Sequence, residues 1–361
     1  MREALQVARS AWPEGPRQSE TAIQLADVCA VLDQDGEAES LYRDALLSRG
    51  AAADQIDDVF VRGVGGLGRL YLLRGEPDKA EPLIRRALDL ETIRLGPGFA
   101  SVTAMFNMAL LHADAGRDED AKRSFGETIE TLERSDGAEL LEAIAVYDNC
   151  ALFCISRGLA DEAESLFRRA LIIRQETVGP RHSVYAAGLL NLGRLQFDRN
   201  ALDEAESLLW QATDVYQRNK ATLYAGYLPA LYYLALIARR NERRDEAGTL
   251  CKKLLAAAEG NADAGGPAEA ALLHVFGLLQ IDRNKAVDAE QMFRRADELA
   301  RSAAPKHRRF ASNILGYMLD DLAVLVRNDG KTTEADALGA HAKDIRDTLS
   351  WSLGRRVFTG S

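Results

Sequence analysis

One short stretch of the sequence, Tyr147 to Cys154 (YDNCALFC), combines residue types that bind metals or carry redox chemistry. It holds a carboxylate at Asp148, an amide at Asn149, and thiols at Cys150 and Cys154. Thiolates and carboxylates are metal ligands, and thiols also undergo oxidation. The stretch therefore raises the question of a metal or redox site, which depends on the elements that position these side chains.

No enzyme signature occurs elsewhere in the sequence. The five histidines are scattered, without an HExxH motif or a pair at metal-ligand spacing. The glycine-rich stretch GVGGLG at 63–68 resembles a phosphate-binding loop superficially, but a nucleotide site needs a preceding strand and a GxxxxGK[ST] pattern. We therefore predict a protein that is not an enzyme and has no cofactor and no metal ligands.

The composition of the 361-residue chain is that of an ordinary soluble protein, with 47% hydrophobic and 28% charged residues. Its net charge of −10 disfavours nucleic-acid binding, which needs a basic surface, and the basic runs at 239–244 and 306–309 fit helix ends or loops. No secretory signal begins the sequence, and the most apolar stretch, 227–238, is too short to span a bilayer. These features predict a cytoplasmic protein that binds neither nucleic acid nor membrane.

The dominant feature of the sequence is an internal repeat. Segments such as DGEAESLYRDAL (35–46), ADEAESLFRRAL (160–171) and LDEAESLLWQAT (202–213) share a fixed alanine. Successive copies of this alanine stand 42, 41, 42, 42, 42, 42 and 46 residues apart. The eight copies are Ala38, Ala80, Ala121, Ala163, Ala205, Ala247, Ala289 and Ala335.

Each repeat is predicted to form two helices joined by a tight turn. Alanine or glycine stands twelve residues before every fixed alanine, where two helices can approach closely, and a larger residue follows four positions after it in seven repeats. Glycine or asparagine recurs five residues before the alanine, and both tolerate the left-handed conformation that ends a helix. The pairs Gly96–Pro97 and Gly179–Pro180, with a loop at 259–267, are predicted to separate repeats.

This pattern resembles the tetratricopeptide repeat in its 42-residue, kinesin light chain-like variety, and the segments 90–102 and 173–186 resemble that variety's inter-repeat segment. The resemblance covers residues 18–350. It implies an all-α fold, a right-handed superhelical α-solenoid of about eight antiparallel helix pairs. Residues 1–17 would then be either a partial repeat or an N-terminal capping helix, and 351–361 a C-terminal tail.

In such a solenoid the first helix of each repeat lines a concave groove, so binding residues should recur at one slot of that helix. Asn107, Asn149 and Asn191 share one slot in three consecutive repeats. A carboxamide both donates and accepts hydrogen bonds, so this ladder could pair with the backbone of an extended peptide. In proteins that the sequence resembles, such asparagines bind extended peptides. The alternative is that they satisfy neighbouring backbone groups.

Other residues complete the predicted groove. Tyr233 takes the asparagine slot of the next repeat, beside Tyr232, and tyrosine is enriched in binding hot spots, although both could instead be core residues. Arg69 and Arg194 share a second inward slot, and Asp148 occupies another. The alternative interpretation of these charges is solvated surface.

The repeat register answers the question raised by Tyr147–Cys154. Cys150 and Cys154 fall in slots that hold packing residues in other repeats, so we predict that both thiols are core residues rather than metal ligands. Asp148 and Asn149 are predicted to face the groove in an exposed position.

The sequence thus predicts a non-enzymatic scaffold that binds an extended peptide segment of an unidentified protein partner, with self-association as an open possibility. The alternative function is a regulatory or sensor arm of a signalling ATPase or of a transcription regulator.

Overall fold

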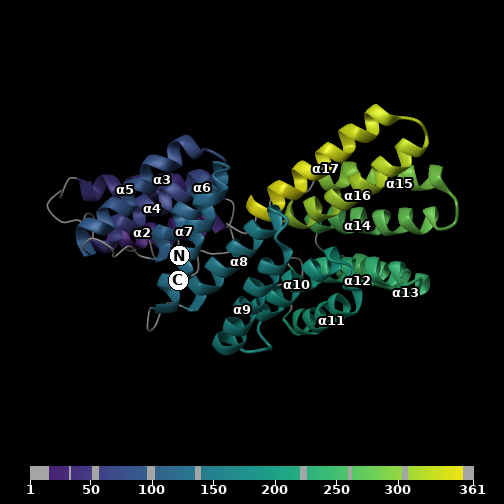
Figure 1. The fold of residues 1–361 in the computed structure, drawn as a ribbon, viewed down its shortest axis with the longest axis horizontal. Coiled ribbons are helices and arrows are strands. Elements are labelled where there is room, and N and C mark those ends of the chain that lie inside the picture. The colour runs from purple at the N-terminus through teal and green to yellow at the C-terminus, as the bar shows by residue number, and fades with distance from the viewer. Residues whose placement is uncertain are drawn as a thin grey trace. The chain divides into compact units, whose positions relative to one another are not determined.

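The computed structural model describes residues 16–31, 34–50, 57–95, 102–134, 140–219, 226–258, 262–302 and 308–352. Sixteen helices and no β-strand occur within these ranges (Figure 1). The first helices of the repeats are α2 (Pro16–Val31), α4 (Asp58–Leu73), α6 (Val102–Asp114), α8 (Leu140–Ser156), α10 (Ser183–Asp198), α12 (Leu228–Arg240), α14 (Ala262–Ile281) and α16 (Arg308–Asn328).

The second helices are α3 (Asp35–Gly50), α5 (Pro77–Leu95), α7 (Asp118–Arg134), α9 (Ala160–Val178), α11 (Leu202–Arg218), α13 (Arg244–Ala258), α15 (Ala286–Arg301) and α17 (Thr332–Ser352). The predicted all-α solenoid of eight helix pairs is therefore confirmed. The segments predicted as a cap and a tail lie largely outside the described residues, as does Gly96–Pro97.

The described helices form two compact units that divide within α8. Unit 1 ends at Cys150 and unit 2 begins at Ala151. In Figure 1 the purple and blue helices α2 to α7 belong to unit 1, and the teal to yellow helices α9 to α17 belong to unit 2. Each unit has its own buried core.

The fixed alanines are the centre of the helix packing, because all eight are fully buried at 0% exposure. The small residue twelve positions before a fixed alanine packs against the large residue four positions after that alanine, on the partner helix. A Cβ atom added at Gly277 would lie 2.4 Å from the Phe293 ring, and one added at Gly68 would lie 2.9 Å from Ile84 Cγ1. The predicted close approach of the two helices is therefore confirmed.

The turns within the helix pairs share one backbone conformation. The residue five positions before the fixed alanine has a positive φ of 60–83° in all seven repeats where it is described. Its N–H and the next N–H cap the end of the first helix, as when Glu76 N–H donates to the Tyr71 carbonyl at 2.9 Å. These residues are Gly75, Gly116, Gly158, Asn200, Glu242, Asn284 and Gly330. The glycine and asparagine positions confirm the predicted turns, and Glu242 was not foreseen.

The predicted loop at 259–267 was wrong for residues 262–267, which form the first turns of α14 with Pro267 inside the helix. Glycine and proline disfavour a helix locally, but the next residues, Ala268 and Ala270, are fully buried, and such packing overrides local propensity. Residues 259–261 lie outside the described part of the chain.

The glycine-rich stretch at 63–68 lies inside α4 and is a packing surface. A Cβ atom at Gly66 would lie 2.7 Å from the Tyr42 ring, and one at Gly63 would lie 2.9 Å from Ile23 Cδ1. Because the stretch is helical, its backbone N–H groups are used within the helix and do not form a phosphate loop.

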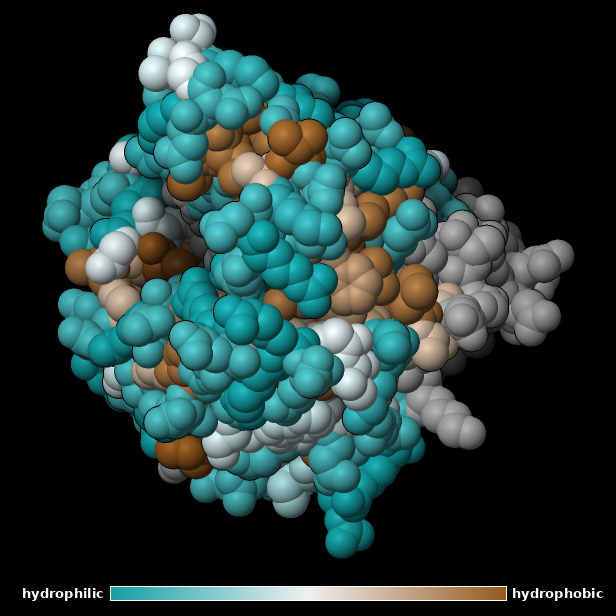
Figure 2. All heavy atoms as spheres, turned by 90° about the vertical axis from the view of Figure 1, so that its right-hand side faces the viewer, coloured by the Kyte–Doolittle hydropathy of each residue, from teal (hydrophilic) through white to brown (hydrophobic). Residues whose placement is uncertain are grey.

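First helices of neighbouring repeats contact each other within each unit, as α4 contacts α6 and as α12 contacts α14. Among the described helices, second helices of neighbouring repeats contact each other less. The first helices therefore lie on the inner side of each unit, as predicted. On the face in Figure 2 the surface is mostly hydrophilic, with hydrophobic side chains in smaller patches. No helix in the described ranges is long and apolar enough to cross a bilayer.

Candidate functional site

The three asparagines of the predicted ladder lie on α6, α8 and α10, and they differ in exposure. Asn107 and Asn149 are buried, with 2% and 1% exposure, whereas Asn191 is partly exposed. The amide of Asn149 donates to the Ala145 carbonyl at 2.9 Å, one helical turn away. Both buried asparagines keep an Oδ1 atom without a hydrogen-bond partner in the described structure. The prediction that Asn149 is exposed was wrong, and a peptide-binding role for the ladder stays a prediction.

Burial of Asn107 has a local cause in the neighbouring repeat. Its Nδ2 atom would lie 3.6 Å from a Cβ atom added at Gly65, so the side chain packs against a bare stretch of α4. Among the described helices, α6 packs against its partner helix α7 and against both helices of the preceding repeat, α4 and α5. The exposed stripe that remains is therefore narrower than the sequence register implied.

The stretch from Tyr147 to Cys154 is buried throughout. Asp148 is 3% exposed, so its predicted exposure was also wrong, whereas the predicted burial of Cys150 and Cys154 is confirmed at 8% each. In the described residues no group of three or more His, Cys, Asp or Glu side chains is arranged to hold a metal ion.

Tyr232 and Tyr233 are also core residues, with 0% and 1% exposure. The Tyr232 hydroxyl lies 2.7 Å from Nδ1 of His274, and Nε2 of this histidine lies 2.9 Å from Asp321. This chain of hydrogen bonds joins α12, α14 and α16. Burial raises the pKa of Tyr232 well above its ordinary value, so the hydroxyl stays protonated and can donate to His274. In this conformation both tyrosines lie beneath the surface. Their predicted role in binding stays a prediction.

Phe197, Tyr233 and Tyr317 form an aromatic cluster in unit 2. Ring centroids lie 5.5 Å apart for Phe197 and Tyr233, 5.9 Å for Phe197 and Tyr317, and 6.0 Å for Tyr233 and Tyr317. The Arg240 guanidinium lies 4.2 Å from the Phe197 centroid, within cation–π range. The Tyr317 hydroxyl donates to the Asp198 carboxylate, which joins α16 to α10 across 119 residues.

Sequence reasoning missed Tyr317, although the signal was present. Tyr317 stands two steps of 42 residues after Tyr233, in the slot of the asparagine ladder. The asparagine slot lies fourteen residues before each fixed alanine, and fourteen residues before Ala335 stands Asp321. The last spacing between fixed alanines is 46 residues instead of 42, so this count misses Tyr317 by four residues.

Polar side chains form an accessible stripe on α10. Asn191 and Arg194 are partly exposed and Asp198 is exposed, and their spacing of three and four residues puts them on one helix face. In the described structure Arg194 has no hydrogen bond or ion pair of its own. Burial opposes its charge, but Tyr233 and Asp198 outweigh this effect and raise the pKa of Arg194. The guanidinium is therefore a charged donor beside the aromatic cluster.

Arg69, the corresponding residue in unit 1, is engaged within the protein. It lies 3.4 Å from Asp27, which occupies the same slot of the preceding repeat. Asp27 also accepts a hydrogen bond from the Tyr42 hydroxyl at 2.5 Å. Of the two predicted arginines, Arg69 thus forms an ion pair and Arg194 forms none in the described structure.

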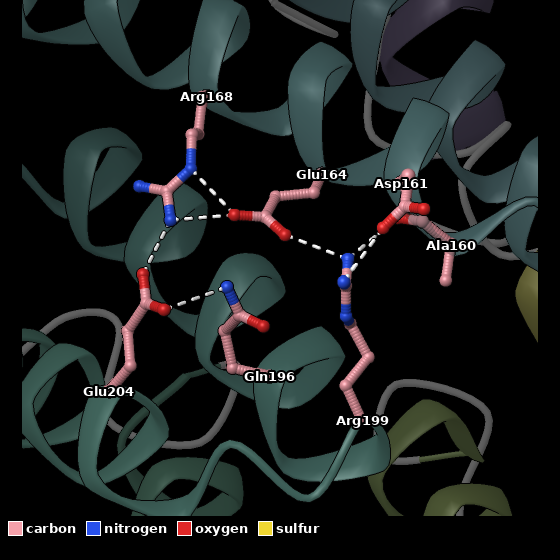
Figure 3. Close-up of polar contacts among 7 residues, drawn as sticks. All are labelled: Ala160, Asp161, Glu164, Arg168, Gln196, Arg199 and Glu204. Atoms are coloured by element: carbon pink, nitrogen blue, oxygen red, sulfur yellow. Dashed lines mark hydrogen bonds and ion pairs between the residues drawn. The ribbon is translucent and has the colours of Figure 1, made fainter.

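Charged residues next to the fixed alanines tie neighbouring repeats together. Figure 3 shows one such clasp, in which Glu164 binds Arg168 of its own helix at 2.7 Å and Arg199 of the next repeat at 2.8 Å. Arg168 also pairs with Glu204 at 2.5 Å. The corresponding pairs elsewhere are Glu39 with Arg74, Glu81 with Arg117, Glu206 with Arg243, and Glu290 with Lys331. The recurrent Ala-Glu of the repeat sequence is thus structural, which sequence reasoning did not foresee.

The basic run at 239–244 is used in the same way. Arg239 pairs with Asp282 at 2.7 Å and Arg243 with Glu206 at 2.6 Å, while Arg240 lies over Phe197. These contacts account for the local excess of positive charge as packing between repeats.

Two parts of the sequence, residues 65–97 and 142–218, match family models described as tetratricopeptide repeat. The chain is a tetratricopeptide repeat protein. No curated protein has a significantly similar sequence.

Several solved structures resemble this tetratricopeptide repeat protein in fold, at low sequence identity. The apo form of RapI matches with a TM-score of 0.61 and 13% identity, over 79% of this chain and 97% of that chain. The apo quorum sensor NprR from B. thuringiensis matches at 0.59 and 15%, over 89% and 86%. A signal transduction ATPase with a tetratricopeptide repeat sensor from Pyrococcus horikoshii matches at 0.59 and 15%, over 94% and 48%. The TM-scores show a shared fold, and at these identities the likeness extends to the fold alone.

The similarity to kinesin light chain-like repeats also has a structural counterpart. Such repeats from Podosopora anserina match over 57% of this chain and 98% of that chain, at 17% identity. Their TM-score is 0.43.

Proposed function

We propose that this protein is a non-enzymatic interaction scaffold that binds an extended peptide segment of a protein partner along the inner helices of unit 2. The observation that carries the proposal is the polar stripe on α10. Asn191, Arg194 and Asp198 follow one another on one accessible face, beside buried aromatic rings. Such a surface offers an amide, a charged donor and an acceptor to a peptide backbone and its side chains.

The spacing of the inner helices suits an extended ligand. Packed helices lie about 8–10 Å apart and a strand advances about 3.3 Å per residue, so neighbouring repeats would meet about every third peptide residue. One hydrogen bond contributes about 0.5–1.5 kcal/mol, whereas micromolar affinity requires about 8 kcal/mol. Most of the affinity must therefore come from buried apolar area. Phe197 and Tyr233 beside the stripe are each 1% exposed, so a ligand reaches their rings only when a covering side chain moves.

Selection of a ligand by the full chain tests the proposal. A display library of random linear peptides would be selected on the full-length protein, and the enriched peptides would be titrated against purified variants. We expect Asn191→Ala combined with Arg194→Ala to weaken binding by about tenfold or more. Lys253→Ala is the matched control, because Lys253 is an exposed cation on the second helix α13. Equal affinity of the enriched peptides for the wild type and the double variant would contradict the proposal.

The second candidate function is a regulatory or sensor arm of a signalling ATPase or of a transcription regulator. The favouring observation is that one similar structure is a signal transduction ATPase with a sensor of this fold, of which 48% is matched. At 15% identity this likeness concerns the fold, so the candidate needs a separate test. Determination of the coding sequence upstream of Met1 provides it, and an in-frame nucleotide-binding domain would favour the arm.

A further inference from the structure

One face of α16 lies against the inner helices of earlier repeats in unit 2. Phe310, Tyr317 and Asp321 are spaced by seven and four residues, which places them on one side of the helix. The Phe310 ring lies 6.1 Å from that of Tyr232 on α12, and Asp321 accepts from His274 on α14. The first helix of the last repeat therefore folds back along the inner side of unit 2.

Tyr317 reaches farthest across this inner side. Its ring meets Phe197 of α10 edge-on, at an interplanar angle of 85°, and meets Tyr233 of α12 at 87°. Its hydroxyl donates to Asp198, the last residue of the polar stripe on α10. A side chain of the protein itself thus occupies the acceptor and the aromatic surface that the proposed function assigns to a partner.

We propose that Tyr317 is a latch that closes the inner groove of unit 2 in the free protein, so that a partner peptide binds after the hydroxyl releases Asp198. The inference rests on the proposed function for the identity of the displacing ligand. The closed contact itself is a property of this chain.

The burial of the groups involved favours a latch over a permanent core contact. Asp198 is exposed and Tyr317 is partly exposed, so the carboxylate can return to water when the bond breaks. Burial raises the pKa of Tyr317 well above its ordinary value, so its hydroxyl stays protonated and donates to Asp198 in the closed contact. Tyr232 and His274, by contrast, are 0% and 1% exposed, and breaking their bond would leave buried polar atoms unpaired. The buried chain therefore anchors α16 to α12 and α14, while the bond at Tyr317 can open.

The number of groove conformations can be measured in the full-length protein by pulsed electron paramagnetic resonance. Spin labels on cysteines introduced at Asp203 of α11 and Ala340 of α17, both exposed, report the separation of the two sides. The natural cysteines at 29, 150, 154 and 251 are all buried and should remain unlabelled. The wild type is expected to give one narrow distance distribution.

Variants of the latch should change this distribution. We expect Tyr317→Ala and Asp198→Ala to move population to longer distances, and Tyr317→Phe to have a smaller effect because it keeps the ring. Val324→Ala, an exposed position on the same helix, is the control and should leave the distribution unchanged. An unchanged distribution in both Tyr317→Ala and Asp198→Ala would overturn the latch. If Tyr317→Ala fails to fold, Asp198→Ala decides the matter.

Peptide affinity separates this inference from the proposed function. For a peptide enriched on the wild type, Tyr317→Ala should bind on the order of tenfold tighter, because the closed state no longer competes. An equal affinity would overturn the latch while the scaffold function stands. Failure to enrich any peptide on either protein would contradict the proposed function, and the distance distributions would still decide the latch.

Discussion

The inner faces of the two units are built from the same repeat slots but pack by different means. In unit 1 the relevant positions of α4 are Gly65 and Gly66, and neighbouring side chains such as Tyr42 and Asn107 pack against the bare helix. In unit 2 the asparagine slot and its continuation hold Tyr233 and Tyr317, whose rings contact each other across two repeats.

This difference shows that repeat spacing places a residue on a helix face without deciding what it contacts. A glycine brings the adjacent helix close, so the contacts of unit 1 are made between neighbouring repeats. An aromatic side chain is long enough to bridge repeats that are not neighbours, as Tyr317 does with Phe197. The size of the side chain at one slot therefore decides whether its contacts stay within neighbouring repeats or extend beyond them.

The largest effects should come from filling the close approaches in either unit. Gly277→Ala and Gly66→Ala introduce methyl groups 2.4 Å from the Phe293 ring and 2.7 Å from the Tyr42 ring. We expect each to lower the free energy of unfolding by about 1–3 kcal/mol, with Gly277→Ala the more severe. Urea denaturation followed by circular dichroism measures the loss. Gly126→Ala, with nothing within 4 Å, should instead stabilise the protein by up to about 1 kcal/mol.

Removal of a single hydroxyl in each unit tests the role of the buried hydrogen-bond chain. Tyr232→Phe leaves Nδ1 of His274 unpaired in the core, and we expect a loss of about 1–3 kcal/mol in the free energy of unfolding. Tyr42→Phe should cost less, because Asp27 keeps its contact with Arg69. Urea denaturation measures the free energy of unfolding of both variants. If Tyr232→Phe and Tyr42→Phe lower it equally, the hydrogen bond to His274 contributes no more stability than the hydrogen bond from Tyr42 to Asp27.

Acid should weaken both units alike, because the charged clasps occur in both. A hydrogen bond from Tyr71 lowers the pKa of Glu39, and one from Arg243 lowers the pKa of Glu206, from the ordinary value of 4.5. A carboxylate with a lowered pKa stabilises the folded state above that value, and this stability is lost as pH falls below it. Exposed pairs contribute about 0–1 kcal/mol each. The urea concentration at half unfolding should therefore decrease once the pH is lowered below about 4.5. A urea midpoint that stays constant down to about pH 3 would contradict the role of the clasps.

One turn of unit 2 departs from the glycine or asparagine found in the others and offers a stabilising change. Glu242 has a φ of 60°, which is unfavourable for a residue with a Cβ atom. Glu242→Gly is expected to raise the free energy of unfolding by about 1 kcal/mol. Gly158→Ala, in the corresponding turn at φ of 74°, should lower it by a similar amount. Thermal unfolding of the two variants gives the comparison, and a loss of stability in Glu242→Gly would contradict it.

The smallest effect is expected at Asn149, one of the two buried ladder positions in unit 1. Asn149→Ala removes one hydrogen bond to Ala145 but also removes an unpaired buried oxygen and a poor helix former. The free energy of unfolding should change by less than about 1 kcal/mol. Peptide binding by Asn149→Ala should also equal that of the wild type, in contrast to variants of Asn191. A binding loss at Asn149 would restore the full ladder as the site.

Much of the fold could be predicted from the sequence, because its signals are local or repeat between neighbours. The fixed alanines, the small residues that face them, and the turn glycines each depend on contacts within one helix pair. The loop at 259–267 was mispredicted where the burial of Ala268 and Ala270 favours helix over the preference of glycine and proline.

The candidate site was less predictable. Register placed Asn149 and Asp148 on a first helix correctly, but both are buried, and burial cannot be read from the register of one helix. The contacts of Tyr317 join α16 to α10 and α12, and no single repeat specifies them.

By itself the sequence determined the number of helix pairs, their turns and the packing of each pair, since these follow from side-chain size and backbone preference at fixed spacing. The tertiary structure decided which inner side chains reach solvent and that Tyr317 meets Asp198. The physical reason is that exposure in a stacked array depends on the side chains of neighbouring repeats. A contact between residues 119 positions apart depends in addition on how the intervening repeats stack on one another.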